Sequence, residues 1–238
     1  MSRADETGPA VDSDRTSLTP TMEDYLRHIY RLEEQGNDWV TNSMVADRLG
    51  VERATVTSMF GTLADAGLIE REKYRPVQLT DEGRRVALRV VRRHRLVETL
   101  LLESFDYSIS EVDAEADVLE HHLSDRLCRE IARVLDEPET DPHGDPIPDA
   151  NLDVAGGEDT VPLTDVPPSE NVAVQRILSQ DEAVLDHLVS AGVEPSATLR
   201  VDERAPFGMV TVSVHGTGEQ TSLPEAVAAK IRVRERTD

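Results

Sequence analysis

A proline-rich segment divides this chain into two parts with different apolar patterns. Residues 137 to 170 carry seven of the thirteen prolines and almost no periodic apolar residues, which is typical of a linker. Upstream of it, apolar residues recur at helical spacing. Downstream, "ENVAVQRILS", "ATLRVDERAP" and "GMVTVSVHG" alternate apolar and polar residues, which predicts strands. We therefore expect a mainly α-helical part followed by a small β-rich domain.

The helical part begins with the pattern of a winged helix-turn-helix. A helix in "TPTMEDYLRHIYRLEEQG" is followed by two short helices around a turn at Gly50, and "ERATVTSMFGTL" forms the second of these. Two short strands joined by a basic turn around Arg75 come next, and Thr80 caps a long helix. In such a fold the second helix of the pair reads the major groove of DNA. An all-helical domain that contains this turn without binding DNA is the alternative for the middle segment.

Candidate DNA contacts lie on the predicted recognition helix and wing. Small polar side chains and an arginine in the first half of the helix would face base edges and phosphates, and basic wing residues would follow the backbone. These candidates are Arg53, Thr55, Thr57, Ser58, Arg71, Lys73 and Arg75. Residues 48 to 75 hold five basic and four acidic side chains, whereas the whole chain has a formal net charge of -22. The overall charge therefore does not exclude DNA as a partner.

The acidic composition suggests a compartment with concentrated salt. Only two of the 25 basic residues are lysines, and at 1 M salt the Debye length falls to about 3 Å, so like surface charges hardly repel. We expect a halophilic cytoplasm. The single cysteine, Cys128, lies in the apolar-periodic run "RLCREIARVL" and is expected to be a buried thiol. No apolar run approaches the roughly 18 residues of a membrane span, and residues 1–17 are expected to form a disordered tail without a signal sequence.

The stretch "DVLEHHLSD" carries several potential metal ligands. On a helix, Asp117, Glu120 and His121 would fall within an arc of roughly 100°, and Asp113 would join them one turn earlier. The preceding helix carries His94 and Glu98 at i, i+4 spacing. One imidazole with two or three carboxylates suits Mn²⁺ or Fe²⁺ better than an ion that prefers thiolates. The alternative is that these carboxylates form the solvated face of an acidic helix.

Five segments together resemble the metal-dependent repressors of the DtxR/MntR family. They are "TPTMEDYLRHIYRLEE", "YRPVQLTDEGRRVA", "RRHRLVETLL", "AEADVLEHHLSD" and "PHGDPIP", and the resemblance runs from about residue 18 to the end. It implies a mainly α fold with small β parts: a winged helix-turn-helix, a helical dimerisation domain and a C-terminal SH3-like (FeoA-type) β-barrel. The expected boundaries are 1–17 for the tail, 18–83 for the DNA-binding domain, 84–137 for the metal-binding and dimerisation domain, 138–169 for the linker and 170–238 for the SH3-like domain.

The resemblance also implies two sets of metal ligands. The primary site would comprise Asp24, Asp117, Glu120 and His121, with the Asp117 carbonyl as a further candidate; the ancillary site would comprise His94, Glu98 and Asp113. The iron-responsive branch has Met and Cys where this chain has Asp24 and Asp117. We therefore expect Mn²⁺ or Fe²⁺, with Mn²⁺ favoured by the harder oxygen donors.

Other residues bear on these sites less directly. The manganese branch has a glutamate ligand where this chain has Arg27, so the resemblance does not imply a closely spaced manganese pair here. His28 is a candidate substitute ligand, with a packed or exposed histidine as the alternative. From the SH3-like domain, Gln180, Asp181 or Glu182 are candidate ancillary ligands by position only. No partner at ligand spacing is found for the histidines at 143, 187 and 215, which are expected to be structural or exposed.

The implied function is a metal-dependent transcriptional regulator, a repressor of metal-uptake genes that serves metal homeostasis. Asp24 precedes the predicted DNA-reading helices, while the other primary ligands follow them. Metal would therefore tie two domains together and favour a homodimer that matches successive major grooves of a palindromic double-stranded operator. An enzyme is not expected. The alternatives are a winged-helix regulator with a non-metal signal and a metallohydrolase that uses a metal-bound water, although no nucleophile motif or glycine-rich phosphate loop supports the latter.

Overall fold

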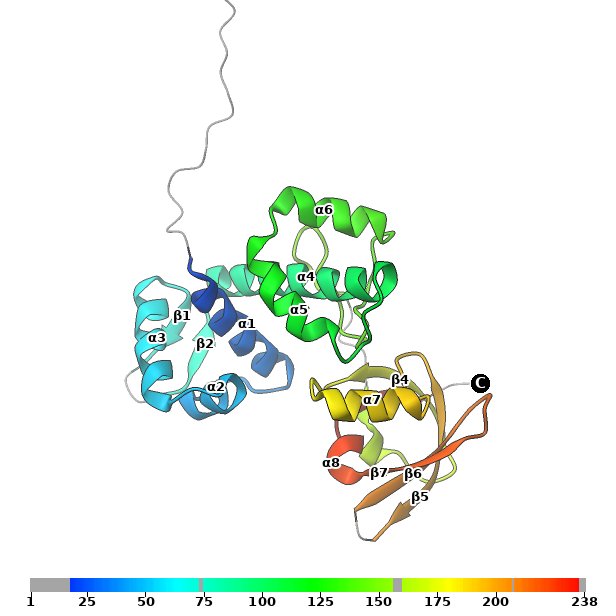
Figure 1. Ribbon diagram of the computed structural model, residues 1–238. Helices are drawn as coiled ribbons and strands as arrows, with labels where there is room; N and C mark the ends of the chain where they lie inside the picture. The colour runs from blue at the N-terminus through cyan, green and yellow to red at the C-terminus, as the bar shows by residue number, and fades with distance from the viewer. Residues whose placement is uncertain (1–17, 73–74, 156–159, 207, 236–238) are drawn as a thin grey trace, which may run out of the picture.

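The computed structural model of the protein describes residues 18–72, 75–155, 160–206 and 208–235. Two helical bodies and one β-rich body follow one another along the chain (Figure 1). None of the helices in these ranges is both long and apolar enough to cross a lipid bilayer. The predicted mainly α fold with small β parts is confirmed.

The first body is a winged helix-turn-helix. It contains α1 (Pro20–Glu34), α2 (Asn42–Leu49), α3 (Arg53–Asp65) and a hairpin of β1 (Ile69–Arg71) with β2 (Val77–Leu79). The side chains of Thr19 and Thr41 cap α1 and α2 by accepting from backbone N–H groups three residues later. Gly50 ends α2 at φ +64°, a conformation that costs glycine little and allows the tight turn into α3.

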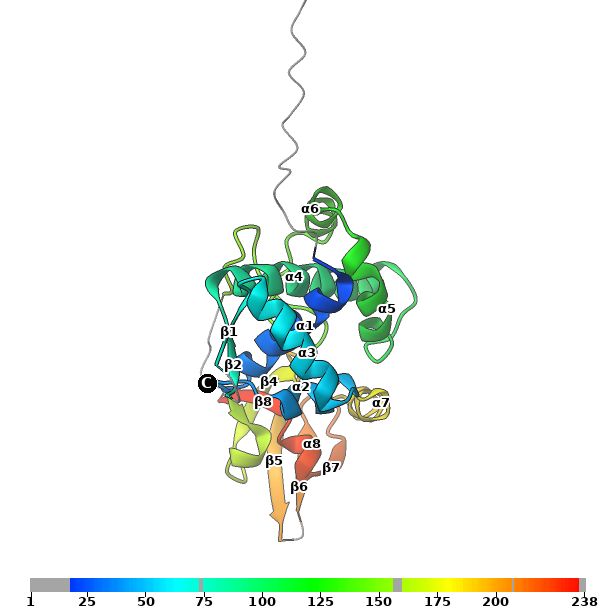
Figure 2. The ribbon, with the colours of Figure 1, turned by 90° about the vertical axis from the view of Figure 1, so that its left-hand side faces the viewer.

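Helix α1 forms the centre of this body. Leu26 and Ile29 of α1 are fully buried, as are Phe60 and Leu63 of α3, and each such side chain contributes about 1.5–3 kcal/mol when buried. The apolar face of α3 therefore points inward. The opposite face is left on the outside of the molecule, where α3 crosses the front of the view in Figure 2.

The long helix α4 (Asp81–Ser104) connects the first and second bodies. Its first half packs into the first core through Val86 and Val91, and its second half packs into other clusters through Leu96 and Val97. The rest of the second body is α5 (Val112–Leu119), a single 3₁₀ turn η1 (Glu120–His122) and α6 (Asp125–Val134). One continuous helix thus carries residues of both domains and sets their spacing.

The helix predicted through "DVLEHHLSD" is shorter than expected. Helix α5 ends at Leu119, and Glu120 and His121 lie in η1. The chain has to leave the helix here because Leu123 is extended and Ser124 caps α6 by accepting from the N–H of Leu127. The prediction that Asp117, Glu120 and His121 share one regular helical face was therefore wrong.

The proline-rich segment packs partly against α4. Ile147 is buried in a cluster with Leu96 and Cys128, while Arg92 and Arg95 of α4 donate to the carbonyls of Pro148 and Pro146. Cys128 is buried, as expected. The first part of the segment is therefore a structural strap on the second body.

The third body is built on an antiparallel sheet in the order β3-β8-β4-β5-β6-β7. Its elements are β3 (Val161–Pro162), η2 (Leu163–Asp165), β4 (Asn171–Ile177), α7 (Glu182–Ser190), β5 (Thr198–Ala205), β6 (Met209–Val214), β7 (Gln220–Pro224), α8 (Glu225–Ala228) and β8 (Ile231–Glu235). Alternate valines of β4, β5 and β6 form its core, as the alternating pattern predicts. Within the described ranges no ladder joins β3 to β7, so closure into a barrel stays a prediction.

A few polar contacts attach the third body to the other two. The N–H of Ile177 in β4 donates to the carbonyl of His143 at 2.9 Å. Just before α7, Gln180 donates to Asp113 of α5 at 2.5 Å and accepts from Arg48 of α2 at 3.4 Å. The start of α7 therefore lies beside α2 of the first body and α5 of the second body.

Candidate metal centre and nucleic-acid interface

Three groups of ligand-type side chains lie at the junction of the domains. The first group is Asp24, Glu120 and His121; the second is His94, Asp113 and Asp117; the third is Glu98, Asp141 and His143. Within each group the potential ligand atoms lie within 4.8 Å of one another. Every residue of the predicted primary and ancillary sets belongs to one of these groups, but the two sets are divided differently among them.

The first group joins α1 to the turn η1. His121 Nε2 lies 2.9 Å from Asp24 Oδ1 and 3.3 Å from Glu120 Oε1. The other imidazole nitrogen, Nδ1, lies 2.8 Å from Glu23 Oε2. A carboxylate that holds the second nitrogen in this way fixes the orientation of a metal-binding histidine. Sequence reasoning missed Glu23, although its place next to Asp24 was a signal.

Two side chains of the first group have pKa values that are shifted by burial and by neighbouring charges. Burial raises the pKa of Asp24, although His121 and Arg27 act in the opposite direction. For His121, burial lowers the pKa, but Glu23, Glu120 and Asp24 outweigh it and the net shift is upward. A cation among these side chains would replace the proton on His121 and favour the ionised form of Asp24.

The first group has an unsatisfied buried oxygen. Glu120 is fully buried, and among the described residues its Oε1 has no hydrogen-bond partner. A buried carboxylate oxygen without a donor is costly, and a metal ion satisfies it. Because Asp24 is one-third exposed, further positions around such an ion are accessible to water. The residues present therefore fit a hard divalent ion.

The second group surrounds a guanidinium. Arg27 Nη1 lies 2.6 Å from Asp117 Oδ1, 3.0 Å from Glu120 Oε2 and 2.7 Å from His94 Nδ1. Asp117 therefore faces Arg27 and His94 instead of the first group, where the sequence had placed it. The termination of α5 at Leu119 accounts for this, because Glu120 and His121 no longer follow Asp117 around a regular helix.

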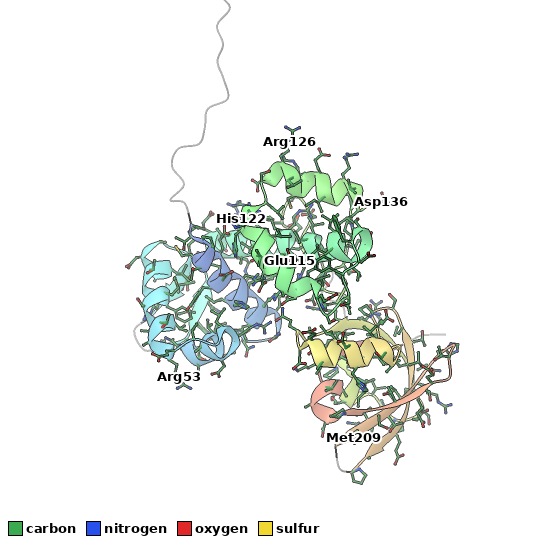
Figure 3. All side chains as sticks on the ribbon, viewed as in Figure 1. Arg53, Glu115, His122, Arg126, Asp136 and Met209 are labelled. Carbon is green, nitrogen blue, oxygen red and sulfur yellow. The ribbon has the colours of Figure 1, made fainter. Side chains whose placement is uncertain are left out.

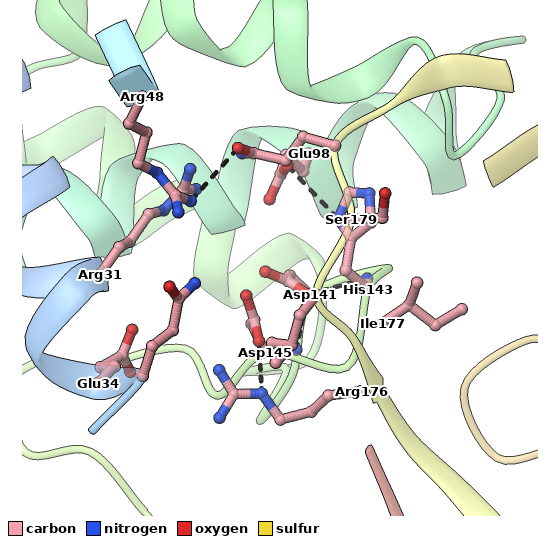
Figure 4. Close-up of a pocket in the computed structure, with 13 residues that line it drawn as sticks. Arg31, Glu34, Arg48, Glu98, Asp141, His143, Asp145, Arg176, Ile177 and Ser179 are labelled. Carbon is pink, nitrogen blue, oxygen red and sulfur yellow. Dashed lines mark hydrogen bonds and ion pairs between the residues drawn. The ribbon is translucent and has the colours of Figure 1, made fainter. Parts of the chain in front are cut away.

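The third group comes from α4 and the strap. Asp141 and His143 are buried beside Glu98, whose Oε1 lies 3.6 Å from His143 Nδ1 and 3.2 Å from His94 Nε2. Figure 4 shows these side chains around a cavity of about 40 Å³. Glu98 Oε2 and His143 Nε2 are buried without a hydrogen-bond partner in the described residues. Burial and the neighbouring Asp145 raise the pKa of Asp141 well above its usual value.

The third group corrects the expectation for His143. This histidine was expected to lack a ligand partner, yet the fold brings it to Glu98, 45 positions earlier in the sequence. The spacing of Asp141 and His143 in "DPHGDP" was the available signal. Helical periodicity could not find it because these residues lie in a loop.

The three domains each match a known family model. Residues 17–77 match the iron dependent repressor N-terminal DNA binding domain, residues 80–149 the iron dependent repressor metal binding and dimerisation domain, and residues 161–235 the FeoA domain. The iron-dependent repressor IdeR of Mycobacterium tuberculosis is 37% identical over 229 residues, which cover 91% of this chain and 97% of the relative. The chain belongs to the iron-dependent repressor family.

Other relatives of this repressor are named for different metals or targets. The diphtheria toxin repressor of Corynebacterium diphtheriae is 31% identical over 92% of this chain and 98% of its own. A solved manganese-dependent transcriptional repressor in complex with manganese superposes with a TM-score of 0.84 at 38% identity, over 90% of this chain and all of the other. The family to which the chain belongs consists of DNA-binding transcriptional repressors and not of enzymes.

The DNA-binding domain of the repressor exposes most of its predicted contacts. Arg53, Thr55, Thr57 and Ser58 are exposed on α3, and Figure 3 shows Arg53 pointing away from the body. Thr57 accepts from Asn42 of α2 at 2.7 Å, so Asn42 adds a polar group that the sequence did not single out. These features leave a polar, weakly charged helix face available to base edges.

The wing of the repressor is described only in part. Arg71 is exposed on β1, and Arg75 is exposed and paired with Glu72 at 2.8 Å. Lys73, the third predicted wing contact, lies outside the described residues.

The remaining candidate ligands have other partners. Gln180 reaches the second group through Asp113, while Asp181 caps α7 and Glu182 is exposed. His28 joins none of the three groups. His187 and His215 are exposed, as expected.

Proposed function

We propose that this repressor binds Mn²⁺ or Fe²⁺ at the first group and uses the ion to hold its DNA-binding and dimerisation domains together. The observation that carries the proposal is the buried Oε1 of Glu120, which has no hydrogen-bond partner among the described residues and lies beside His121 and, across the domain junction, Asp24. The ion would supply a positive charge that draws the carboxylates of the two domains together. Relatives named as iron-dependent and manganese-dependent repressors support this assignment.

The oxygen-rich donor set favours manganese. The first group offers two carboxylates and one imidazole, and the third group has the same composition. Hard oxygen donors suit Mn²⁺, whereas softer thioether and thiolate donors would favour iron or zinc. The third group would serve as the second site, because its two unpartnered buried atoms also call for a cation.

The chain's own contacts explain how binding would reach DNA. Asp24 lies on α1, which packs against both α2 and α4, and Glu120 and His121 lie on η1. Fixing α1 against η1 therefore also positions α2, against which α3 packs. If the ion binds this closed arrangement better than an open one, it shifts the population toward the operator-binding form.

The operator-binding form would be a homodimer. Apolar side chains are exposed at the end of α4, on α5 and on α6, namely Leu102, Phe105, Val118, Leu127 and Val134. We infer that they meet a second copy, so that two α3 helices enter successive major grooves, about 34–36 Å apart, on a palindromic operator. The regulated genes would be those for metal uptake, and the repressor would act in the cytoplasm.

Substitution at η1 tests the proposal. Glu120→Ala or His121→Ala removes a ligand of the first group, so we expect metal-stimulated binding to the operator to fall at least tenfold. His122→Ala is the matched control, because His122 is exposed on the same turn (Figure 3). Fluorescence anisotropy with labelled operator DNA, with Mn²⁺, Fe²⁺ or chelator under anaerobic conditions, measures the effect.

Two outcomes would contradict the proposal. One is DNA affinity of the unsubstituted protein that does not change with chelator, which would favour a regulator with a non-metal signal. The other is a His122→Ala variant that loses metal response as fully as His121→Ala. Isothermal titration with Mn²⁺ then decides whether the ion binds at all.

A further inference from the structure

Arg27 stands at the centre of the second group in the manner of a bound cation. It is 1% exposed, and a single nitrogen, Nη1, contacts two carboxylates and one imidazole at 2.6–3.0 Å. An arginine side chain keeps its charge at any ordinary pH. The guanidinium is therefore a permanent positive charge inside a cluster of ligand-type atoms.

The second group differs from the other two in how its atoms are satisfied. Among the described residues, the first and third groups each contain buried ligand atoms without a hydrogen-bond partner, whereas none is found on His94 or Asp113; the third member, Asp117, is 45% exposed and also open to water. Asp113 pairs with His94 and Gln180, and Asp117 pairs with Arg27. The buried atoms of the second group thus already have partners within the protein.

Glu120 connects the first group to the second. Its Oε1 faces His121, and its Oε2 accepts from Arg27 at 3.0 Å and lies 2.7 Å from His94 Nδ1. A carboxylate with this arrangement can bridge two cations. In this structure the Arg27 guanidinium occupies the position beside Oε2.

We propose that Arg27 is a built-in cation that takes the place of a metal ion in the second group. The inference rests on the proposed function, because it assumes that an ion binds the first group. Under this proposal, Arg27 determines whether the Glu120 carboxylate binds one ion or bridges a pair of ions. It also makes Arg27 part of the tie between domains, since α1 is joined to α5 and η1 through this side chain before any metal arrives.

The test counts ions in variants of Arg27. Arg27→Gln removes the charge and leaves Asp117, Glu120 and His94 able to bind Mn²⁺, so we expect one more ion per protomer than in the unsubstituted chain. Arg27→Lys keeps the charge and is expected to keep the original number. Equilibrium dialysis with Mn²⁺ measures the number, and thermal unfolding checks that each variant is folded.

Electron paramagnetic resonance identifies where the added ion lies. Two Mn²⁺ ions that share a carboxylate are typically about 3.5–4 Å apart, so their spectra are coupled and broadened. We expect this signature in Arg27→Gln and not in the unsubstituted chain or in Arg27→Lys. Arg27→Glu is a second variant, which places a carboxylate where the guanidinium was and should also gain a coupled ion.

The outcomes separate this inference from the proposed function. If the unsubstituted chain binds Mn²⁺ and both Arg27→Gln and Arg27→Glu bind the same number with uncoupled spectra, the built-in cation is overturned. A coupled pair in the unsubstituted chain overturns it as well. If the unsubstituted chain binds neither Mn²⁺ nor, under anaerobic conditions, Fe²⁺, the proposed function fails first, and it does so in a measurement that needs no Arg27 variant.

Discussion

His28 shows how strongly the arginines of the domain junction act on their neighbours. Burial lowers its pKa, and the nearby Arg27, Arg31 and Arg48 lower it further, to about 2. The imidazole is therefore neutral in the folded protein at any ordinary pH. In the unfolded chain its pKa returns to about 6.5.

This difference predicts an acid-sensitive contribution to stability. Above pH 6.5 neither state binds the proton; below it the unfolded chain does and the folded one does not, so stability is lost as the pH falls. The loss is about 1.4 kcal/mol for each pH unit below 6.5. Urea unfolding of the metal-free protein at pH 7.5 and 5.5 should show a smaller decrease for His28→Gln than for the unsubstituted chain.

Exposed His187 provides the control for this measurement. His187→Gln should leave the decrease between the two pH values unchanged. Parallel pH curves for His28→Gln and the unsubstituted chain would contradict the assigned pKa.

Single residues also show the limit of sequence-based prediction of the site. The structure brings Asp24 beside Glu120 and His121, as the residue-by-residue match of the resemblance implied; their role as ligands stays a prediction. The neighbours of Asp117 and His143 were not predictable, because they depend on where α5 ends and on how a proline-rich loop folds back on α4. Neither is determined by local spacing of ligand-type residues.

At the scale of elements, the close approach of α4 to the wing depends on one glycine. A Cβ on Gly83 would lie 1.8 Å from the carbonyl oxygen of Leu68, which accepts from the N–H of Thr80. The start of α4 could not then keep its place against the wing. By contrast, a Cβ on Gly61 in α3 would meet only the flexible end of Arg71, at 3.3 Å.

Substitution of alanine for these two helical glycines should therefore change the free energy of unfolding in opposite directions. We expect Gly83→Ala to lower the free energy of unfolding by about 3 kcal/mol, because overpacking against backbone is costly. Gly61→Ala should raise it by about 0.5–1 kcal/mol, because alanine has the higher helix propensity. Urea unfolding of both variants measures the difference, and shifts of the same sign would contradict the packing described.

Element boundaries were predictable where a side chain or a glycine determines them. Thr19, Thr80 and Gly50 each lie at the helix end that the sequence indicated. The 3₁₀ turn after Leu119 was not predictable, because it results from competition between the end of α5 and the cap that Ser124 provides for α6. Periodicity alone continues a helix through such a place.

At the scale of the whole molecule, the exposed apolar side chains are the clearest sign of a second copy. Phe105 is 57% exposed and Val118 is 62% exposed, and both lie in the segment that matches a metal-binding and dimerisation domain. Val134 on α6 is 66% exposed and, with Leu127 of the same helix, forms a second exposed apolar run.

Charged substitutions should therefore dissociate the dimer. We expect Phe105→Asp or Val118→Asp to halve the molar mass seen by light scattering at micromolar concentration, and to weaken operator binding at least tenfold because only one half-site is held. Val134→Asp tests the second run in the same way. Val161→Asp, at an exposed site of the third body, is the control, and an unchanged mass for the other three variants would contradict this interface.

The division into a helical and a β-rich part was predictable from composition, but the attachment of the two parts was not. Prolines and alternating valines separate the helical and β-rich parts in the sequence. The contacts of Gln180 with Asp113 and Arg48 depend on tertiary packing that no local pattern records. Adaptation to concentrated salt stays a prediction from the charge of -22.

The strap on α4 has a consequence for recombination between relatives. It supplies Asp141 and His143 to the third group, and its His143 carbonyl also accepts from Ile177 of β4. A chimaera joined before residue 141 would therefore inherit two potential ligands from the parent of its C-terminal half. Exchange of the C-terminal domain at that point would also exchange part of the metal centre, and a junction after Asp153 would keep the centre whole.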